Sequence, residues 1–291
     1  MTATVHVPVL PSEVLEHLRP APGGVFVDGT LGGGGHARAI AEAVSPGGRV
    51  LAIDLDPAAI EAAEASLAGL PIELHIGSYT AVPEMVQQAG LDAVDGVLLD
   101  LGLSSDQLAD HERGFSFDAA GPLDLRFDPT RGEPAWRMLR RMAEKDIADV
   151  LYHYGEERYS RRIARKVVAR NASDPIEAAG DFAALVRSCV PRSRTNPIDP
   201  ATRSFQALRI AVNEELKSVE TALRLLPGVL RPGGRLAIIS FHSLEDRLVK
   251  HAFRDDPRLD VVTRRPVTAS DSESQRNPRS RSAKLRVAER D

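Results

Sequence analysis

The sequence predicts an α/β fold, in which a largely parallel sheet is covered by helices on both faces and is interrupted by an all-helical insertion. In the first hundred residues, short apolar runs without polar alternation are separated by helical segments, which is typical of strands buried on both faces. Between Leu108 and Pro200 only helical periodicity and loops occur, and the alternation then resumes. A chain of 291 residues, 43% of them hydrophobic, can bury a core of this size.

The first part of the sheet is predicted from four apolar runs, three of which end in an aspartate. Ser12 is expected to cap a short helix that ends at Leu18, and Asp56 with Pro57 has the cap and first-turn proline of a helix start. We expect strands at 25–28, 49–54, 72–76 and 96–100, and helices at 36–44, 57–67 and 83–89.

The insertion is expected at residues 109–200, as a helical substrate-recognition domain within a cofactor-binding domain formed by residues 1–108 and 201–291. Two of its helices are predicted at 143–154 and 159–171. After it, we expect one long helix at 201–226, a strand at 235–240, a helix at 243–253 and two closing strands at 260–266 and 284–288.

The composition is that of an ordinary soluble protein. Cys189 is the single cysteine, which excludes an intramolecular disulfide and a CxxC metal site. No apolar run approaches the roughly 18 residues of a membrane span, and the N-terminus has no signal-peptide pattern. We therefore expect a cytoplasmic protein. A monomer and a homodimer are both compatible with the sequence.

Charge is distributed unevenly along the chain. Residues 1–100 hold 3 Lys and Arg against 13 Asp and Glu, whereas residues 101–291 hold 34 against 28. A polyanionic partner is therefore expected on the second part.

The most informative stretch is Val25–His36, where an apolar run ends in Asp28 and is followed by five glycines in seven residues and then a helical pattern. Glycine lacks a Cβ and tolerates positive φ, so such a loop lets the backbone approach a nucleotide-type cofactor closely. Gly32-x-Gly34-x-x-Ala37 matches the loose dinucleotide fingerprint, which is a weak signal alone. Asp28 favours S-adenosylmethionine, because a carboxylate would repel a pyrophosphate but suits the ammonium of a methionine moiety.

Each strand-end acid also has a simpler interpretation. Asp28 could brace the turn by accepting loop N–H groups. Asp54 is placed to accept both ribose hydroxyls of either cofactor, and its alternative role as a helix cap is already filled by Asp56.

Several sequence blocks in one order extend over nearly the whole chain. They are His6–Leu10, Val27–His36, Ala52–Asp54, Leu99–Gly102, Arg113–Phe117, Gly121–Arg126, Thr202–Ile210, Ser240–Asp246 and Arg281–Arg286. Together these blocks resemble the ribosomal RNA small subunit methyltransferase H family. The resemblance implies a Rossmann-like, class I S-adenosylmethionine-dependent methyltransferase sheet and methylation of the exocyclic amine, N4, of a cytosine in 16S rRNA of the small ribosomal subunit.

The resemblance also implies which residues bind S-adenosylmethionine. His36 could present its ring or N–H to the methionine end, or be a bland cap-region histidine; Tyr79 could lie against the adenine or on the surface. Ser104 and Gln107 have the spacing of a capping box, so Gln107 could satisfy helix donors instead of a ligand. The expected cofactor-binding set is Asp28, Gly32, Gly34, Gly35, His36, Asp54, Tyr79, Asp100 and Gln107.

Asp100 ends the fourth predicted strand, where an acceptor for the target amine belongs. The cytosine amine is a poor nucleophile, and acceptors for its protons would orient the lone pair and offset the developing charge. Many amino-methyltransferases carry an acid or asparagine here followed by two prolines and an aromatic residue, which this chain lacks. The expected catalytic groups are Asp100, Ser104 and Ser105, with backbone carbonyls of Leu101 or Gly102; an Asp100 that binds only the cofactor is equally compatible.

No metal site or covalent nucleophile is expected. His242 and Glu245 could provide two ligands on one helical turn, but no third ligand is apparent in the sequence. Cys189 lies in an apolar helical context and is not expected to attack a pyrimidine ring.

The RNA base must be single-stranded or flipped to reach the methyl group. Arg113, Phe115 and Phe117 combine charge and rings near the fourth strand, although this loop could equally dock on the core. A basic face on the helix at 159–171 and the basic last sixteen residues could contact phosphates or simply be solvated. The expected RNA-binding set is Arg113, Phe115, Phe117, Arg126, Arg203, His242, Arg281 and Lys284.

Two other functions remain to be weighed against an rRNA cytosine methyltransferase. A nicotinamide dehydrogenase would bind NADH tightly and S-adenosylhomocysteine not at all. A noncatalytic RNA-binding factor with a relic cofactor pocket would keep its cellular function after Asp100→Ala.

Overall fold

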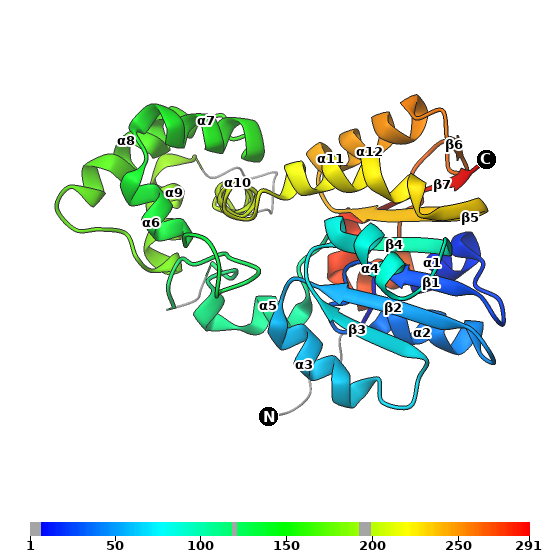
Figure 1. The fold of residues 1–291 in the computed structure, drawn as a ribbon. Helices are drawn as coiled ribbons and strands as arrows, with labels where there is room; N and C mark the ends of the chain where they lie inside the picture. Colours follow the sequence, from blue (N-terminus) through cyan, green and yellow to red (C-terminus); the bar gives the residue numbers. More distant parts are fainter. Residues whose placement is uncertain (1–6, 118–120, 192–198) are drawn as a thin grey trace. The chain divides into compact units, whose positions relative to one another are not determined.

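The computed structural model describes residues 7–117, 121–191 and 199–291, which form two compact units (Figure 1). The sheet unit runs up to Ser104 and from Leu216 to Asp291, and the helical unit is Ser105–Glu215. His6, in the first family block, lies outside the described residues. Of the helices that the structure describes, none has the length and apolarity to cross a membrane.

The sheet unit is built on seven strands in the order β3-β2-β1-β4-β5-β7-β6. β1 to β5 are parallel, and β7 runs antiparallel between β5 and β6. Because the order reverses between β1 and β4, the carboxyl ends of these two strands flank the place where open α/β sheets bind ligands. The strands are β1 Val25–Asp28, β2 Arg49–Asp54, β3 Ile72–Ile76, β4 Val94–Asp100, β5 Leu230–Ser240, β6 Leu259–Val261 and β7 Lys284–Arg290.

Each face of this sheet has its own buried core. Phe26 and Leu98 point to one face, where they pack with α1, α2 and α3, and Val27 and Leu99 point to the other, where they pack with α4, α11 and α12. The apolar runs of the parallel strands are therefore covered on both sides, as predicted. The helices are α1 Pro11–Leu18, α2 Gly35–Val44, α3 Pro57–Ser66, α4 Val82–Gln88, α11 Glu215–Leu225, α12 Ser243–Asp255 and α13 Asp271–Arg276, with short 3-10 turns η1 Tyr79–Ala81, η3 Leu226–Gly228 and η4 Pro278–Ser282.

The helical unit contains no strand among its described residues, only a single bridge between Pro122 and Ala178. α7 packs against α8 and α10. Gly155 lets α7 approach α10 closely, since a Cβ there would lie 2.4 Å from the Arg203 carbonyl oxygen. Cys189 is buried in this unit. Its elements are α5 Ser105–Ala109, η2 His111–Arg113, α6 Ala135–Arg141, α7 Glu144–Gly155, α8 Ser160–Asn171, α9 Ala179–Cys189 and α10 Thr202–Asn213.

Three local predictions were wrong. The strand expected at 260–266 is the three-residue β6, which ends at Val261. Ser12 does not cap α1, which follows Leu10 in a left-handed conformation and begins with Pro11, a residue suited to a first helical position. The single helix expected at 201–226 is two helices, because Glu214 adopts φ 49° and ends α10. α10 packs against α7, while α11 contributes Val219 and Ala222 to the sheet unit.

Candidate cofactor and acceptor site

Three carboxylates lie at the carboxyl edge of neighbouring strands. Asp28, Asp54 and Asp100 end β1, β2 and β4, and the register aligns Asp28 with Ala52 and Leu98, two residues before the other acids. The structure therefore brings together three of the predicted site residues at the switch point of the sheet.

The glycine loop after β1 is held from both sides. The Gly32 N–H donates to Asp54 Oδ2 at 2.7 Å, and Thr30 Oγ1 accepts the Asp100 N–H at 2.6 Å. Gly32 and Gly34 adopt φ of 48° and 75°, a region that favours glycine, and Gly34 is the N-cap position of α2. The loop thus brings the start of α2 beside the strand-end acids, where the Ala37 N–H interacts with Asp28 and His36 lies near Asp100.

Asp28 carries an unsatisfied oxygen. Its side chain is 1% exposed, its Oδ1 accepts the Thr30 N–H at 3.1 Å, and its buried Oδ2 has no hydrogen-bond partner among the described residues. Burial raises the pKa of this carboxyl from 3.8 to about 7, and the nearby charges of Asp100 and Asp54 add to the effect. A buried, unpartnered carboxylate oxygen is costly and suits a cationic ligand such as an ammonium. Oδ1 braces the turn, which is the simpler interpretation of Asp28, and binding of an ammonium by Oδ2 stays a prediction.

Asp54 also organises backbone on both sides. Its Oδ1 accepts the Asp56 N–H at 2.9 Å, in addition to the bond from Gly32, and burial raises its pKa. Asp56 caps α3 by accepting the Ala58 N–H at 3.1 Å, as predicted. Asp54 therefore does not serve as the cap, and its carboxylate can accept further donors because each oxygen has two lone pairs.

Asp100 sits between groups of opposite charge. His36 Nε2 lies 3.9 Å from Asp100 Oδ2, and the Gly102 N–H donates to Oδ1 at 3.4 Å. Burial raises the pKa of Asp100 to about 6; the positive charge of Arg279 lowers it and the negative charge of Glu245 raises it.

The other predicted site residues are divided between the units. Ser104 lies beside the glycine loop, since a Cβ on Gly32 would be 3.6 Å from the Ser104 Cβ. Tyr79 follows β3 in η1 and packs partly buried against the sheet core. Ser105 and Gln107 belong to α5 of the helical unit.

The two phenylalanines of the predicted RNA loop pack within the helical unit. Phe115 is buried and stacks on Phe127 with ring centroids 5.9 Å apart, and Phe117 meets Phe205 edge to face at 4.9 Å. These contacts correspond to the alternative in which the loop docks on a core.

The arginines of the same unit differ in their contacts. Arg113 donates to the carbonyls of Arg126 and Phe127 at 3.0 and 2.7 Å, and Arg126 forms two 2.7 Å bonds with the carboxylate of Asp124. Arg203 is exposed. The exposed face of α8 is basic, as its periodicity predicted, with Ile163, Ala164 and Val167 buried beneath. That face consists of Arg161, Arg162, Arg165, Lys166 and Arg170.

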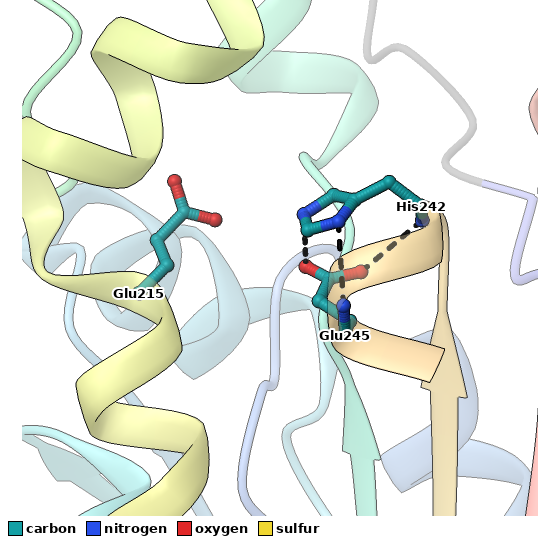
Figure 2. A group of neighbouring side chains, drawn as sticks. All are labelled: Glu215, His242 and Glu245. Atoms are coloured by element: carbon teal, nitrogen blue, oxygen red, sulfur yellow. Dashed lines mark hydrogen bonds and ion pairs between the residues drawn. The ribbon is translucent and has the colours of Figure 1, made fainter. Parts of the chain in front are cut away.

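His242 and Glu245 form a capping box at the start of α12, shown in Figure 2. The Glu245 N–H donates to His242 Nδ1 at 3.4 Å, and Glu245 Oε2 accepts the Phe241 N–H at 2.9 Å. The third side chain drawn, Glu215, belongs to the helical unit, where its oxygens accept two 2.8 Å bonds from Arg209. His242 and Glu245 thus serve as a helix cap, and Glu215 forms an ion pair with Arg209.

The remaining RNA candidates lie near the C-terminus. Lys284 Nζ lies 3.4 Å from Asp246 Oδ2, and the exposed Arg281 donates to the Ser274 carbonyl at 3.2 Å.

Arg279 is a member of the site that the sequence did not single out. Its guanidinium donates to the carbonyl of Leu103, 176 residues away, and its charge acts on Asp100. Arg276 and Arg281 have the same side chain and similar neighbours in the sequence, but both are exposed. Only the folded arrangement distinguishes them.

Comparisons with known proteins identify the relatives of this chain. Two proteins named ribosomal RNA small subunit methyltransferase H, from Rhodopirellula baltica and Thermomicrobium roseum, are each 50% identical to this chain, covering 99% of it and 92% and 94% of their own lengths. One of the same name from Geobacter sulfurreducens is 47% identical and covers 98% of both chains. The seven-stranded, largely parallel sheet, covered by helices on both faces, confirms the predicted α/β fold. The acid-lined glycine loop lies at the switch point of this sheet. Because the model of the MraW methylase family matches residues 3–291, the chain belongs to that family.

Proposed function

We propose that the protein transfers a methyl group from S-adenosylmethionine to the exocyclic amine, N4, of a specific cytosine in 16S rRNA of the small ribosomal subunit. The observation that carries the substrate is the 50% identity, over 99% of the chain, to proteins named for methylation of small-subunit rRNA. The resemblance of the ordered sequence blocks supports the cytosine amine as the acceptor.

The strand-end residues fit the cofactor. Asp28 offers its buried, unpartnered Oδ2 to the methionine ammonium, Asp54 offers carboxylate lone pairs to the ribose hydroxyls, and the glycines from Gly32 to Gly35 allow close backbone approach. A dinucleotide pyrophosphate fits less well, because it would face the unpartnered oxygen of Asp28. The cofactor, when bound, supplies a methyl group on a positively charged sulfur for in-line displacement.

Asp100 is the acceptor group that we propose for the target amine. An ionised Asp100 accepts an amino proton of the cytosine, which directs the nitrogen lone pair toward the methyl group and offsets the positive charge that develops on nitrogen. Ser104 and the carbonyls of Leu101 and Gly102 are on the same segment and can complete the alignment. Holding the acceptor in line is the main task of the enzyme in such a displacement.

We propose that exposed basic groups provide the phosphate contacts. Arg203, Arg281 and the basic face of α8 are exposed to solvent. Arg126 and Lys284 have carboxylate partners, so we expect them to contribute less to RNA affinity than Arg203 and Arg281. A lower salt dependence of binding after Arg203→Gln would support this role.

The decisive experiment uses small ribosomal subunits from cells that lack the modification. Incubation with methyl-labelled S-adenosylmethionine should place label on N4 of one cytosine, identified by nucleoside digestion and mass spectrometry. Asp100→Asn should lower incorporation by at least about tenfold, while Asp92→Asn, an exposed acid just before β4, should not. Label that is absent from cytosine would exclude the proposed function.

A further inference from the structure

The C-terminal segment Asp271–Ser282, which carries Arg279, is hydrogen-bonded to the residues that precede α1. Glu273 Oε1 accepts the Leu10 N–H at 2.7 Å, and the side-chain amide of Asn277 donates to the Val7 carbonyl at 3.2 Å. Asn277 is 8% exposed, and the adjoining Ser280 is 1% exposed with its hydroxyl bonded to the Asn277 carbonyl at 2.8 Å. The segment is thus a fixed part of the sheet unit and not a solvated tail.

The same N-terminal residues touch the cofactor loop. A Cβ on Gly35 would lie 2.9 Å from Pro8 Cδ, so the backbone at Gly35 and the ring of Pro8 are in close contact. The C-terminal segment, residues 7–10 and the glycine loop therefore form one continuous packed layer beside the strand-end acids.

Arg279 extends from this layer to the segment that follows β4. Its guanidinium donates to the Leu103 carbonyl, and its charge reaches Asp100 three residues earlier. The other charged groups that face Asp100 are His36 from α2, Asp28 from β1 and Glu245 from α12. Asp28 and Glu245 are acids, and His36 is positively charged only when it is protonated. Of these described residues, Arg279 therefore supplies the permanent positive charge near Asp100.

We infer that Arg279 is a positioning residue for methyl transfer: it fixes the Leu101–Ser104 segment through the Leu103 carbonyl and keeps Asp100 available as an ionised acceptor. This inference rests on the proposed function, because it assigns Asp100 to the target amine. It separates Arg279 from Arg276 and Arg281, which flank it in the sequence and are exposed to solvent.

The kinetic test compares Arg279→Gln, Arg279→Lys and, as a matched control, Arg265→Gln, an exposed arginine between β6 and α13. Loss of the positive charge should move the acidic limb of the pH profile of kcat upward by about one unit, which lowers turnover about tenfold on that limb, with KM for RNA unchanged. Lysine should keep the limb in place but reduce kcat, because it lacks the planar guanidinium that holds a carbonyl. Arg265→Gln should match the wild type.

Three results would overturn the inference: an unchanged limb in Arg279→Gln, an increase in KM for RNA alone, or an Arg279→Lys variant with wild-type kcat. If Arg279→Gln does not fold, as judged by circular dichroism, the kcat of Arg279→Lys tests the inference: a reduced kcat supports it and a wild-type kcat contradicts it. The titration of Asp100 can also be followed without RNA, by carboxyl-carbon NMR of aspartate-labelled protein assigned with Asp100→Asn. A wild-type protein that methylates no cytosine would count against the proposed function, whereas an Asp100 titration that is unchanged in Arg279→Gln would count against this inference.

Discussion

Burial of Asp28 makes the stability of the protein depend on pH. Its folded-state pKa of about 7 lies above the usual 3.8, so the folded protein binds more protons than the unfolded chain between these values. Stability contributed by this group is therefore lost as the pH rises from about 4 to about 7. At neutral pH the site retains a carboxylate that destabilises the protein without a ligand.

We predict that Asp28→Asn stabilises the ligand-free protein at pH 8 and weakens cofactor binding. Asparagine keeps the acceptor for the Thr30 N–H and removes the buried charge, so a gain of roughly 1–3 kcal/mol in the free energy of unfolding is expected after the cost of burying the amide. Denaturant titrations at pH 8 and pH 5 measure this, and the gain should shrink at pH 5. Asp92→Asn controls for loss of a surface charge; an equal loss of stability at both pH values would refute the prediction.

The same titration predicts how cofactor affinity depends on pH. A bound ammonium favours the ionised form of Asp28, so below about pH 7 binding must release a proton and the affinity for S-adenosylhomocysteine should fall by up to about tenfold per unit. Calorimetry in two buffers with different ionisation enthalpies counts the proton released. Proton release that persists in Asp28→Asn would assign it to another group.

At the scale of single elements, the sequence predicted best where the signal is local. An apolar run that ends in an acid placed Asp28, Asp54 and Asp100 at strand ends, and Asp56 with Pro57 identified the start of α3. The break at Glu214 was not predictable, because apolar periodicity continues across it and no glycine marks its left-handed conformation. The place of Arg279 was not predictable either, since its contact with Leu103 joins distant parts of the chain.

The junction of the glycine loop and α2 is sensitive to a small change in side-chain size. Gly34 combines φ 75° with a tight neighbour, since a Cβ would lie 3.0 Å from Leu67 Cδ1. We predict that Gly34→Ala destabilises the protein by roughly 1–3 kcal/mol and weakens S-adenosylhomocysteine binding, because the strained backbone must shift in the loop that approaches the cofactor.

Gly69→Ala is the matched control for this substitution. Gly69 has φ 83° in the turn before β3, and no atom lies within 4 Å of the position that a Cβ would occupy there. It should show a similar loss of stability in thermal denaturation with unchanged affinity by calorimetry. Equal losses of affinity in both variants would mean that strain, and not the loop, determines binding.

At the scale of the whole molecule, an interrupted strand alternation was sufficient to predict a helical insertion in an α/β fold. The lateral order of the strands was not predictable in the same way, since the sequence contains no local signal for placing β7 between β5 and β6. The position of α10 also depends on long-range packing, because its apolar face packs on α7.

Both hydrophobic cores of the sheet unit consist entirely of residues from that unit. We therefore predict that replacing residues 105–215 by a flexible glycine-serine linker leaves a folded domain that still binds S-adenosylhomocysteine. Asp28, Asp54 and the glycine loop all remain in it. Such a domain should not methylate small ribosomal subunits, because the basic face of α8 and Arg203 are removed. Calorimetry and label incorporation on the same preparation separate the two activities. Methylation that survives the excision would show that substrate recognition resides in the sheet unit.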